Sequence, residues 1–277
     1  MPLDTDRLLT PAELAAALDA EPPTADLLVV DVGTPDRYAR AHVPGAMLVT
    51  PPELVSGIPP ASGTLPDLER LEALIERLGL ADDTVVVAYD DEGGGWAGRL
   101  LWTLEVVGHR AWKYLDGGIH AWHAEGMPLS SAPPERPPRS QRLTLDRSHV
   151  AEAEDVLLAS ETGSAQIWDA RSHAEYTGER VSAARGGHVP GARHLDWLDL
   201  MDQDRALRLR TDLEDVIARA GIDLARPVIT HCQSHHRSGL SWLVARLLGA
   251  ADVRAYHGSW GEWGNRADLP VRTGAEP

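Results

Sequence analysis

Residues 166–195 read QIWDARSHAEYTGERVSAARGGHVPGARHL, and residues 27–49 read LLVVDVGTPDRYARAHVPGAMLV. Each stretch has an apolar strand-like run that ends in aspartate, then a polar helix-like segment, then His-Val-Pro-Gly-Ala. The second copy is longer because it contains an insertion before this shared motif. A pattern that recurs over so long a unit indicates a tandem duplication, and two copies are too few for a solenoid.

A second pair of similar stretches lies downstream. TVVVAYDDEGGGWAGRLLWTLEVVGHRAWKYLDGGIHAW at residues 84–122 resembles RPVITHCQSHHRSGLSWLVARLLGAADVRAYHGSWGEW at residues 226–263. In both, a β-branched run precedes a loop, and leucines then recur at helical spacing. This alternation favours an α/β fold of two tandem domains, each a mainly parallel sheet flanked by helices. Residues 131–141, rich in proline, read as a linker between domains at 1–130 and 142–277.

The overall composition argues against several classes of protein. A formal net charge of −16 does not suit a general nucleic-acid surface or an anionic membrane. No run approaches about 20 apolar residues, so no transmembrane helix is predicted. The start, MPLDTDRLLT, lacks the basic and apolar regions of a signal peptide. The single cysteine cannot form an internal disulfide, and these features favour a cytoplasmic location.

That cysteine, Cys232, stands within THCQSHHRSG at residues 230–239. It follows the predicted strand at 228–230 and precedes a predicted helix, which is the ligand-binding edge of an open α/β sheet. The loop from Cys232 to Arg237 can form a nest of backbone N–H groups, and the helix beginning near Ser238 adds its positive end. Together with Arg237 and protonated histidines, these features predict a lowered pKa for the thiol and nucleophilic sulfur chemistry.

Two other interpretations of this loop stay open. Cys232 could be a buried hydrophobic residue, as free cysteines commonly are, although the flanking sequence beyond Thr230 is not apolar. A metal site could use His231, Cys232, His235 and His236. Four ligands packed into six residues cannot readily encircle one ion, so no metal is predicted.

Taken together, the sequence resembles the two-domain rhodanese family of sulfurtransferases. The resemblance rests on both His-Val-Pro-Gly-Ala segments, on LDGGIHAW and YHGSWGEW, and on a lone loop cysteine in the second repeat. It implies that Cys232 attacks the outer sulfur of a small anionic donor, carries that sulfur as a persulfide and passes it on. The implied acceptor is cyanide, a thiol or a sulfur-acceptor protein, and no cofactor is implied beyond the covalent persulfide.

The first repeat acts as an internal comparison for this site. Aligned without gaps from the strand, Asp90 stands where the second repeat has Cys232. Carboxylates at Asp90, Asp91 and Glu92 repel an anionic donor and cannot form a persulfide. The first domain is therefore expected to be non-catalytic, and the resemblance implies that it packs against the second domain and shapes one wall of the cleft.

The residues expected to bind the donor lie around Cys232. The loop contributes Gln233, Ser234, His235, His236, Arg237 and Ser238. Arg171 either contacts the donor or makes a structural ion pair with Asp169, and Arg185 comes from the insertion. Thiosulfate-specific relatives typically follow the cysteine with two cations and have an arginine where this chain has Glu175, whereas mercaptopyruvate-specific ones have Gly-Ser-Gly. Three cation-capable loop residues nevertheless favour thiosulfate over 3-mercaptopyruvate.

Two functions of other classes compete with sulfur transfer. HCQSHHRS nearly matches the His-Cys-x5-Arg-Ser/Thr signature of cysteine phosphatases, but only four residues separate Cys232 from Arg237. A shorter loop makes a smaller ring of N–H groups, which suits one sulfur atom better than a phosphoryl group. The other alternative is a non-catalytic module that senses sulfur or docks a partner. Such a module would have an intact thiol but no turnover.

Overall fold

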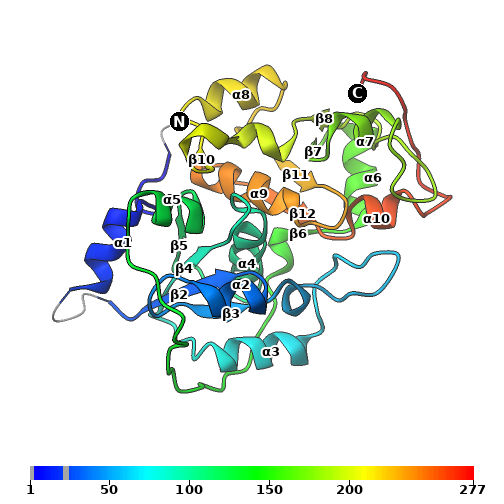
Figure 1. The fold of residues 1–277 in the computed structure, drawn as a ribbon. Coiled ribbons are helices and arrows are strands. Elements are labelled where there is room, and N and C mark those ends of the chain that lie inside the picture. Colours follow the sequence, from blue (N-terminus) through cyan, green and yellow to red (C-terminus); the bar gives the residue numbers. More distant parts are fainter. Residues whose placement is uncertain (1–2, 21–24) are drawn as a thin grey trace.

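The first domain is built on a parallel five-stranded sheet (Figure 1). The computed structural model describes residues 3–20 and 25–277. The strand order is β1-β5-β4-β2-β3. The strands are β1 (Leu8–Leu9), β2 (Leu27–Val32), β3 (Met47–Val49), β4 (Val85–Tyr89) and β5 (Trp112–Leu115). The α-helices are α1 (Pro11–Leu18), α2 (Pro35–Arg40), α3 (Leu68–Arg77), α4 (Gly95–Val106) and α5 (Gly118–Ala124).

The second domain repeats this plan with the order β6-β12-β11-β7-β8, again parallel throughout. Its sheet strands are β6 (Val150–Ala151), β7 (Gln166–Asp169), β8 (Arg193–His194), β11 (Val228–His231) and β12 (Val253–Tyr256). A small antiparallel pair is added by β9 (Met201–Asp202) and β10 (Arg208–Leu209). The α-helices are α6 (Ala153–Thr162), α7 (His173–Thr177), α8 (Leu213–Arg219), α9 (Arg237–Leu247) and α10 (Ser259–Trp263).

The two sheets correspond strand for strand, which confirms the predicted tandem α/β fold. In each, the central strand is the one that precedes the loop of interest, β4 in the first domain and β11 in the second. Both central strands are largely buried, as expected for strands of a parallel sheet that is covered on both faces. The loops at 90–94 and 232–236 therefore leave equivalent sheet edges.

The domains are joined through α4 and α9, which lie side by side at the centre of the molecule (Figure 1). Glycines allow this close crossing: a Cβ added to Gly98 would lie 2.3 Å from the carbonyl oxygen of Gly239. One hydrophobic cluster, which includes Leu100 and Leu243, continues across both domains. Since α4 and α9 both begin where the equivalent loops end, this interface brings the two loops together.

The predicted linker, residues 131–141, contains no helix or strand. It is nevertheless held against the first domain, because Arg136 donates hydrogen bonds to both carboxylate oxygens of Asp26. No described helix is long and apolar enough to cross a membrane.

The His-Val-Pro-Gly-Ala motif forms the same local structure in both domains. His42 stacks on Tyr38 with ring centroids 3.9 Å apart, and His188 stacks on Tyr176 at 3.8 Å. In each pair the Nδ1 of the histidine hydrogen-bonds to the backbone carbonyl of the tyrosine. The motif stabilises the segment before the edge strand in both domains, in agreement with its presence in both repeats.

Candidate functional site

Cys232 directly follows β11 and precedes α9, but it is more buried than its polar sequence neighbours suggested. Its exposed fraction is 0%, and it lies at the margin of the hydrophobic cluster that spans the domains. The sequence favoured a reactive thiolate in a polar loop, and a buried hydrophobic cysteine was the alternative. The first domain packs against this loop: a Cβ added to Gly63 would lie only 2.1 Å from the Ser234 carbonyl oxygen. Residues remote in sequence thus contact the loop.

The sulfur of Cys232 is buried among hydrogen-bond donors rather than in purely apolar packing. The backbone N–H and the hydroxyl of Ser238, at the start of α9, are among the groups that favour its thiolate form. Burial by itself would raise the pKa of the thiol, but the charge of Arg237, the Ser238 hydrogen bonds and the charge of His236 outweigh it. The net effect is a pKa below the ordinary value for cysteine, which favours the nucleophilic thiolate.

Ser259, which the sequence did not point to, holds the loop at residues 232–236 in place through its side-chain oxygen. Its Oγ accepts hydrogen bonds from the backbone N–H groups of Cys232, at 3.4 Å, and His235, at 3.0 Å. Backbone N–H groups of α10 add two further bonds, from Trp260 to the Cys232 carbonyl and from Gly261 to the Gln233 carbonyl. These bonds compensate the unusual positive φ of His235, which is 50°.

The sequence predicted that His235 attracts the donor anion, but in the structure its ring is buried and uncharged. Burial, together with the charges of Arg99 and His257, lowers its pKa well below the usual range, so its ring is neutral at pH 7. Its Nδ1 lies 2.8 Å from Ser238 Oγ. This contact orients the hydroxyl of Ser238, which is one of the groups that lower the pKa of the thiol.

The equivalent loop of the first domain holds a carboxylate where the second holds sulfur. Asp90 Oδ1 accepts hydrogen bonds from the N–H groups of Glu92, Gly93 and Gly94, and Oδ2 accepts one from Ala97. This loop is therefore an anion nest filled by its own side chain. The structure shows such a nest around Asp90 in the first domain, whereas in the Cys232 loop the N–H groups of Cys232 and His235 donate to Ser259 Oγ.

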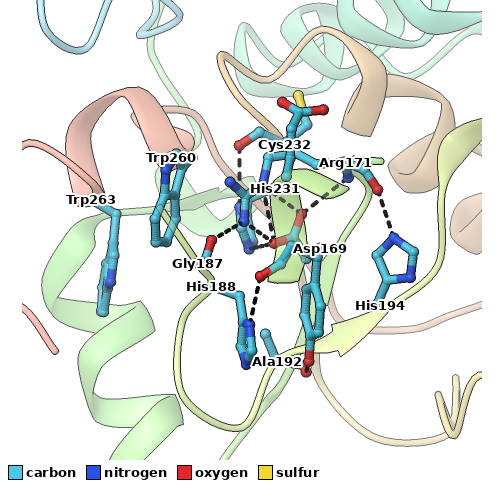
Figure 2. Close-up of polar contacts among 12 residues, drawn as sticks. Asp169, Arg171, Gly187, His188, Ala192, His194, His231, Cys232, Trp260 and Trp263 are labelled. Atoms are coloured by element: carbon cyan, nitrogen blue, oxygen red, sulfur yellow. Dashed lines mark hydrogen bonds and ion pairs between the residues drawn. The ribbon is translucent and has the colours of Figure 1, made fainter. Parts of the chain in front are cut away.

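Arg171 makes the structural ion pair that the sequence left open as an alternative (Figure 2). Its guanidinium binds both carboxylate oxygens of Asp169 and the Gly187 carbonyl, and it lies 4.3 Å from the centroid of the Trp260 ring. The side chain is almost wholly buried. His231 lies on the other side of the same carboxylate, with Nε2 at 3.7 Å. This cluster supports the carboxyl ends of β7 and β11.

Arg185 is likewise engaged with the backbone. Its guanidinium donates hydrogen bonds to the carbonyl oxygens of Trp263, Arg266 and Leu269. These contacts tie the insertion to the segment after α10, at a distance in sequence that no local pattern reveals. The structure gives Arg185 no contact with the Cys232 loop among the described hydrogen bonds.

Arg237 is close to the sulfur, but its charge is shared. Its two terminal nitrogens bind the carboxylate of Glu175 at 2.7 and 3.0 Å. Burial would raise the pKa of Glu175, yet this bidentate pair overrides it and lowers the pKa to about 2. Glu175, which stands where an arginine was expected for a thiosulfate-using enzyme, thus balances part of the charge of Arg237.

The remaining loop side chains meet the first domain or the insertion. His236 stacks on Trp96 with centroids 4.3 Å apart, and its Nε2 contacts the Glu92 carboxylate. The Gln233 amide nitrogen donates to the Ser182 carbonyl at 3.1 Å. Ser234 presents its carbonyl to Gly63. No group of three or more metal-binding side chains occurs within residues 3–20 and 25–277.

Comparisons with known proteins agree with this geometry. The sequence profile of the Rhodanese-like domain matches residues 10–125 and 152–266. Thiosulfate sulfurtransferase of Azotobacter vinelandii is 46% identical over 264 residues, covering 95% of this chain and 96% of that protein. Thiosulfate sulfurtransferase of Pseudomonas aeruginosa is 45% identical over 270 residues, covering 97% of each. In fold, the chain resembles the anaerobic ergothioneine biosynthesis enzyme from Chlorobium limicola, with a TM-score of 0.86 at 22% identity over 98% of this chain and 71% of that one.

Proposed function

The chain belongs to the rhodanese family, with two rhodanese-like domains in tandem, and from this premise we propose that it is a thiosulfate sulfurtransferase acting through a persulfide on Cys232. The observation that carries the proposal is the lone cysteine sulfur between β11 and α9, with a pKa below the ordinary value because Arg237, Ser238 and His236 outweigh its burial. Donors already in place for a sulfur anion need no reorganisation when the charge moves to a second sulfur.

The first half-reaction loads the enzyme. The Cys232 thiolate attacks the outer sulfur of thiosulfate, a new S–S bond forms to Cys232, and the bond between the two thiosulfate sulfurs breaks. The electron pair of that bond leaves with sulfite. The negative charge then rests on the outer sulfur of the persulfide, within reach of donors at the start of α9.

The second half-reaction unloads it. An acceptor nucleophile attacks the outer persulfide sulfur, the persulfide S–S bond breaks, and its electron pair returns to Cys232 as thiolate. With cyanide the product is thiocyanate, and with a thiolate it is a persulfide of the acceptor. We propose a small thiol or a protein thiol as the acceptor in a reducing compartment such as the cytoplasm, because the unpaired Cys232 works only in its reduced state.

The phosphatase and binding-module alternatives are not favoured. The cysteine phosphatase signature has five residues between its cysteine and arginine, whereas four separate Cys232 from Arg237, and the relatives at 46% and 45% identity are thiosulfate sulfurtransferases. The lowered thiol pKa and the Ser238 donors support chemistry at Cys232 rather than a module without turnover.

Steady-state kinetics with cyanide as acceptor test the proposal. We expect thiosulfate to be used with a higher kcat/KM than 3-mercaptopyruvate, and Cys232→Ser to have no activity with either donor while keeping the wild-type circular dichroism spectrum. Higher efficiency with 3-mercaptopyruvate would overturn the donor assignment. Activity retained in Cys232→Ser, or hydrolysis of an aryl phosphate that rivals sulfur transfer, would overturn the proposed chemistry itself.

A further inference from the structure

Arg99, on α4 of the domain that lacks the cysteine, is a fully buried cation with an exposed fraction of 0%. Its terminal nitrogens donate to backbone carbonyls, that of Gly63 at 2.8 Å and that of Leu54 at 2.6 Å. Its Nε is buried without a hydrogen-bond partner. The guanidinium carbon lies 4.7 Å from the centroid of the Trp102 ring. All of these contacts are neutral.

A buried guanidinium without a carboxylate is unusual, because burying an uncompensated charge is costly. Arg171, which is buried to a similar degree, is paired with Asp169. Within the described part of the chain, Arg99 makes no ion pair with an aspartate or glutamate. The anion that acts on it electrostatically is the sulfur of Cys232.

Packing explains how Arg99 comes to act on a residue of the other domain. A Cβ added to Gly239 would lie 2.7 Å from the Arg99 backbone nitrogen, so α4 touches α9 beside Ser238. From there, the Arg99 side chain runs along Trp102, whose ring meets the His235 ring edge-on at 4.5 Å. His235 in turn contacts Ser238, which is one of the groups that lower the pKa of the thiol.

We propose that Arg99 is a positioning residue whose charge balances the sulfur anion of Cys232, as thiolate and as persulfide, across the domain interface. The role rests on the proposed sulfur transfer and gives the domain without a cysteine a direct part in it. Arg99 acts in addition to Arg237, whose charge lowers the pKa of the thiol even though Arg237 is also paired with Glu175. Arg99 has no such balance and is shielded from solvent, where a charge acts more strongly.

The pKa of Arg99 is consistent with this position of its charge near the Cys232 sulfur. Burial lowers the pKa of Arg99 to about 9, and the Cys232 sulfur opposes that fall. Arg99 therefore remains charged at neutral pH. The other ionisable groups around the sulfur or its partners are His235, His236 and Arg237 of the loop, Glu175 on Arg237, Glu92 on His236, His231, Asp169 and Arg171 at the ends of β11 and β7, and His257 after β12.

The pH titration of the Cys232 thiolate, followed by its ultraviolet absorbance, tests this role. The chain has one cysteine, so the signal reports Cys232 alone once the spectrum of Cys232→Ser has been subtracted to remove tyrosine ionisation. Arg99→Gln keeps an amide donor for the carbonyls of segment 54–64 but removes the charge. We expect it to raise the midpoint by about one pH unit or more. We expect Arg99→Lys, which keeps the charge, to stay within about half a unit of wild type.

Arg70 offers a matched control. It also binds backbone carbonyls of the same segment, those of Val55 and Ser56, but its side chain is exposed. Arg70→Gln should titrate as wild type. A wild-type midpoint in Arg99→Gln, or an equal rise in Arg70→Gln, would mean that Arg99 only fastens the segment. If Arg99→Gln does not fold, a rise of about one unit in Arg99→Lys overturns the proposal.

The titration needs no turnover, so it separates this inference from the proposed function. A low thiolate midpoint that depends on Arg99, in a protein that takes no sulfur from thiosulfate, would contradict the sulfurtransferase proposal alone. Normal turnover with a midpoint that does not depend on Arg99 would contradict the role of Arg99 alone.

Discussion

Replacing Glu175 with glutamine removes the carboxylate that binds Arg237 and leaves the shape of the side chain unchanged. The pair is sheltered, since the exposed fraction of the Glu175 side chain is 6%. A fall in the Glu175 pKa from 4.5 to about 2 corresponds to about 3 kcal/mol of stability at neutral pH. Glutamine keeps one carbonyl acceptor, so we expect Glu175→Gln to lower the free energy of unfolding by about 2 to 3 kcal/mol at pH 7.

The sign of the pH dependence follows from the lowered pKa. A carboxylate with a depressed folded pKa contributes its full stability above its unfolded value of 4.5 and loses it as the pH falls towards 2. By pH 3 the contribution should be less than half of its value at pH 7. Urea unfolding of wild type and Glu175→Gln at pH 7 and pH 3 measures both numbers. Equal stability at pH 7, or a gap that does not narrow at pH 3, would refute the reasoning.

The same substitution has a consequence for the donor. Without Glu175 the charge of Arg237 is no longer balanced, so a dianionic donor should bind more tightly. We expect the KM for thiosulfate to fall about fivefold at low ionic strength and the gain to shrink as salt is added. A KM that rises, or a gain that does not respond to salt, would show that Glu175 positions Arg237 rather than balancing its charge.

Three further perturbations probe the domain interface and the covered site. Gly98→Ala places a Cβ against the Gly239 carbonyl, so urea unfolding should show a free energy of unfolding lower by about 2 to 3 kcal/mol. An unchanged free energy of unfolding would mean that α4 and α9 can separate freely. Asp90→Ala leaves four N–H groups, three of them buried, without their acceptor, so we expect about 3 kcal/mol of destabilisation by the same method. Sulfur loading at Cys232 should persist, and its loss in the folded variant would contradict a non-catalytic first domain. Glu92→Ala removes the contact between the first domain and His236 of the Cys232 loop, so alkylation of the buried Cys232 by iodoacetamide should be about tenfold faster at pH 7. An unchanged rate would mean that the thiol becomes accessible elsewhere.

Repetition in the sequence predicted the architecture well, because it reported on the backbone. Two copies of a strand ending in aspartate, a helix and His-Val-Pro-Gly-Ala predicted two parallel α/β domains, and the sheets have the same strand order. The tyrosine–histidine stacks at His42 and His188 follow from the same duplication. The spacing of Cys232 between β11 and α9 placed the thiol at a sheet edge and beside the start of a helix.

The environment of the thiol was harder to predict, because distant segments create it. Glu175 and Arg237 are 62 residues apart, and no local pattern pairs them. Arg99 belongs to the domain whose loop lacks a cysteine, so a search centred on Cys232 passes over it. The Cys232 loop also meets the first domain, through Ser234 against Gly63 and His236 against Glu92, and these contacts exist only once the domains have packed together.

The different environments of the two loop histidines could not be predicted from the sequence either. His235 and His236 are adjacent and identical in type, yet the structure makes one a neutral partner of Ser238 and the other a contact of Glu92. The difference comes from backbone direction, because His235 turns inward with a positive φ of 50°. A sequence gives the residue types of a loop, but not which of them face solvent.

The intact mass of the protein after a single exposure to thiosulfate shows whether Cys232 carries a persulfide. We expect a gain of one sulfur, about 32 Da, located at Cys232 and released as an equal amount of thiocyanate when cyanide is added. Turnover without that added mass, or the same added mass on Cys232→Ser, would contradict a persulfide held on this residue.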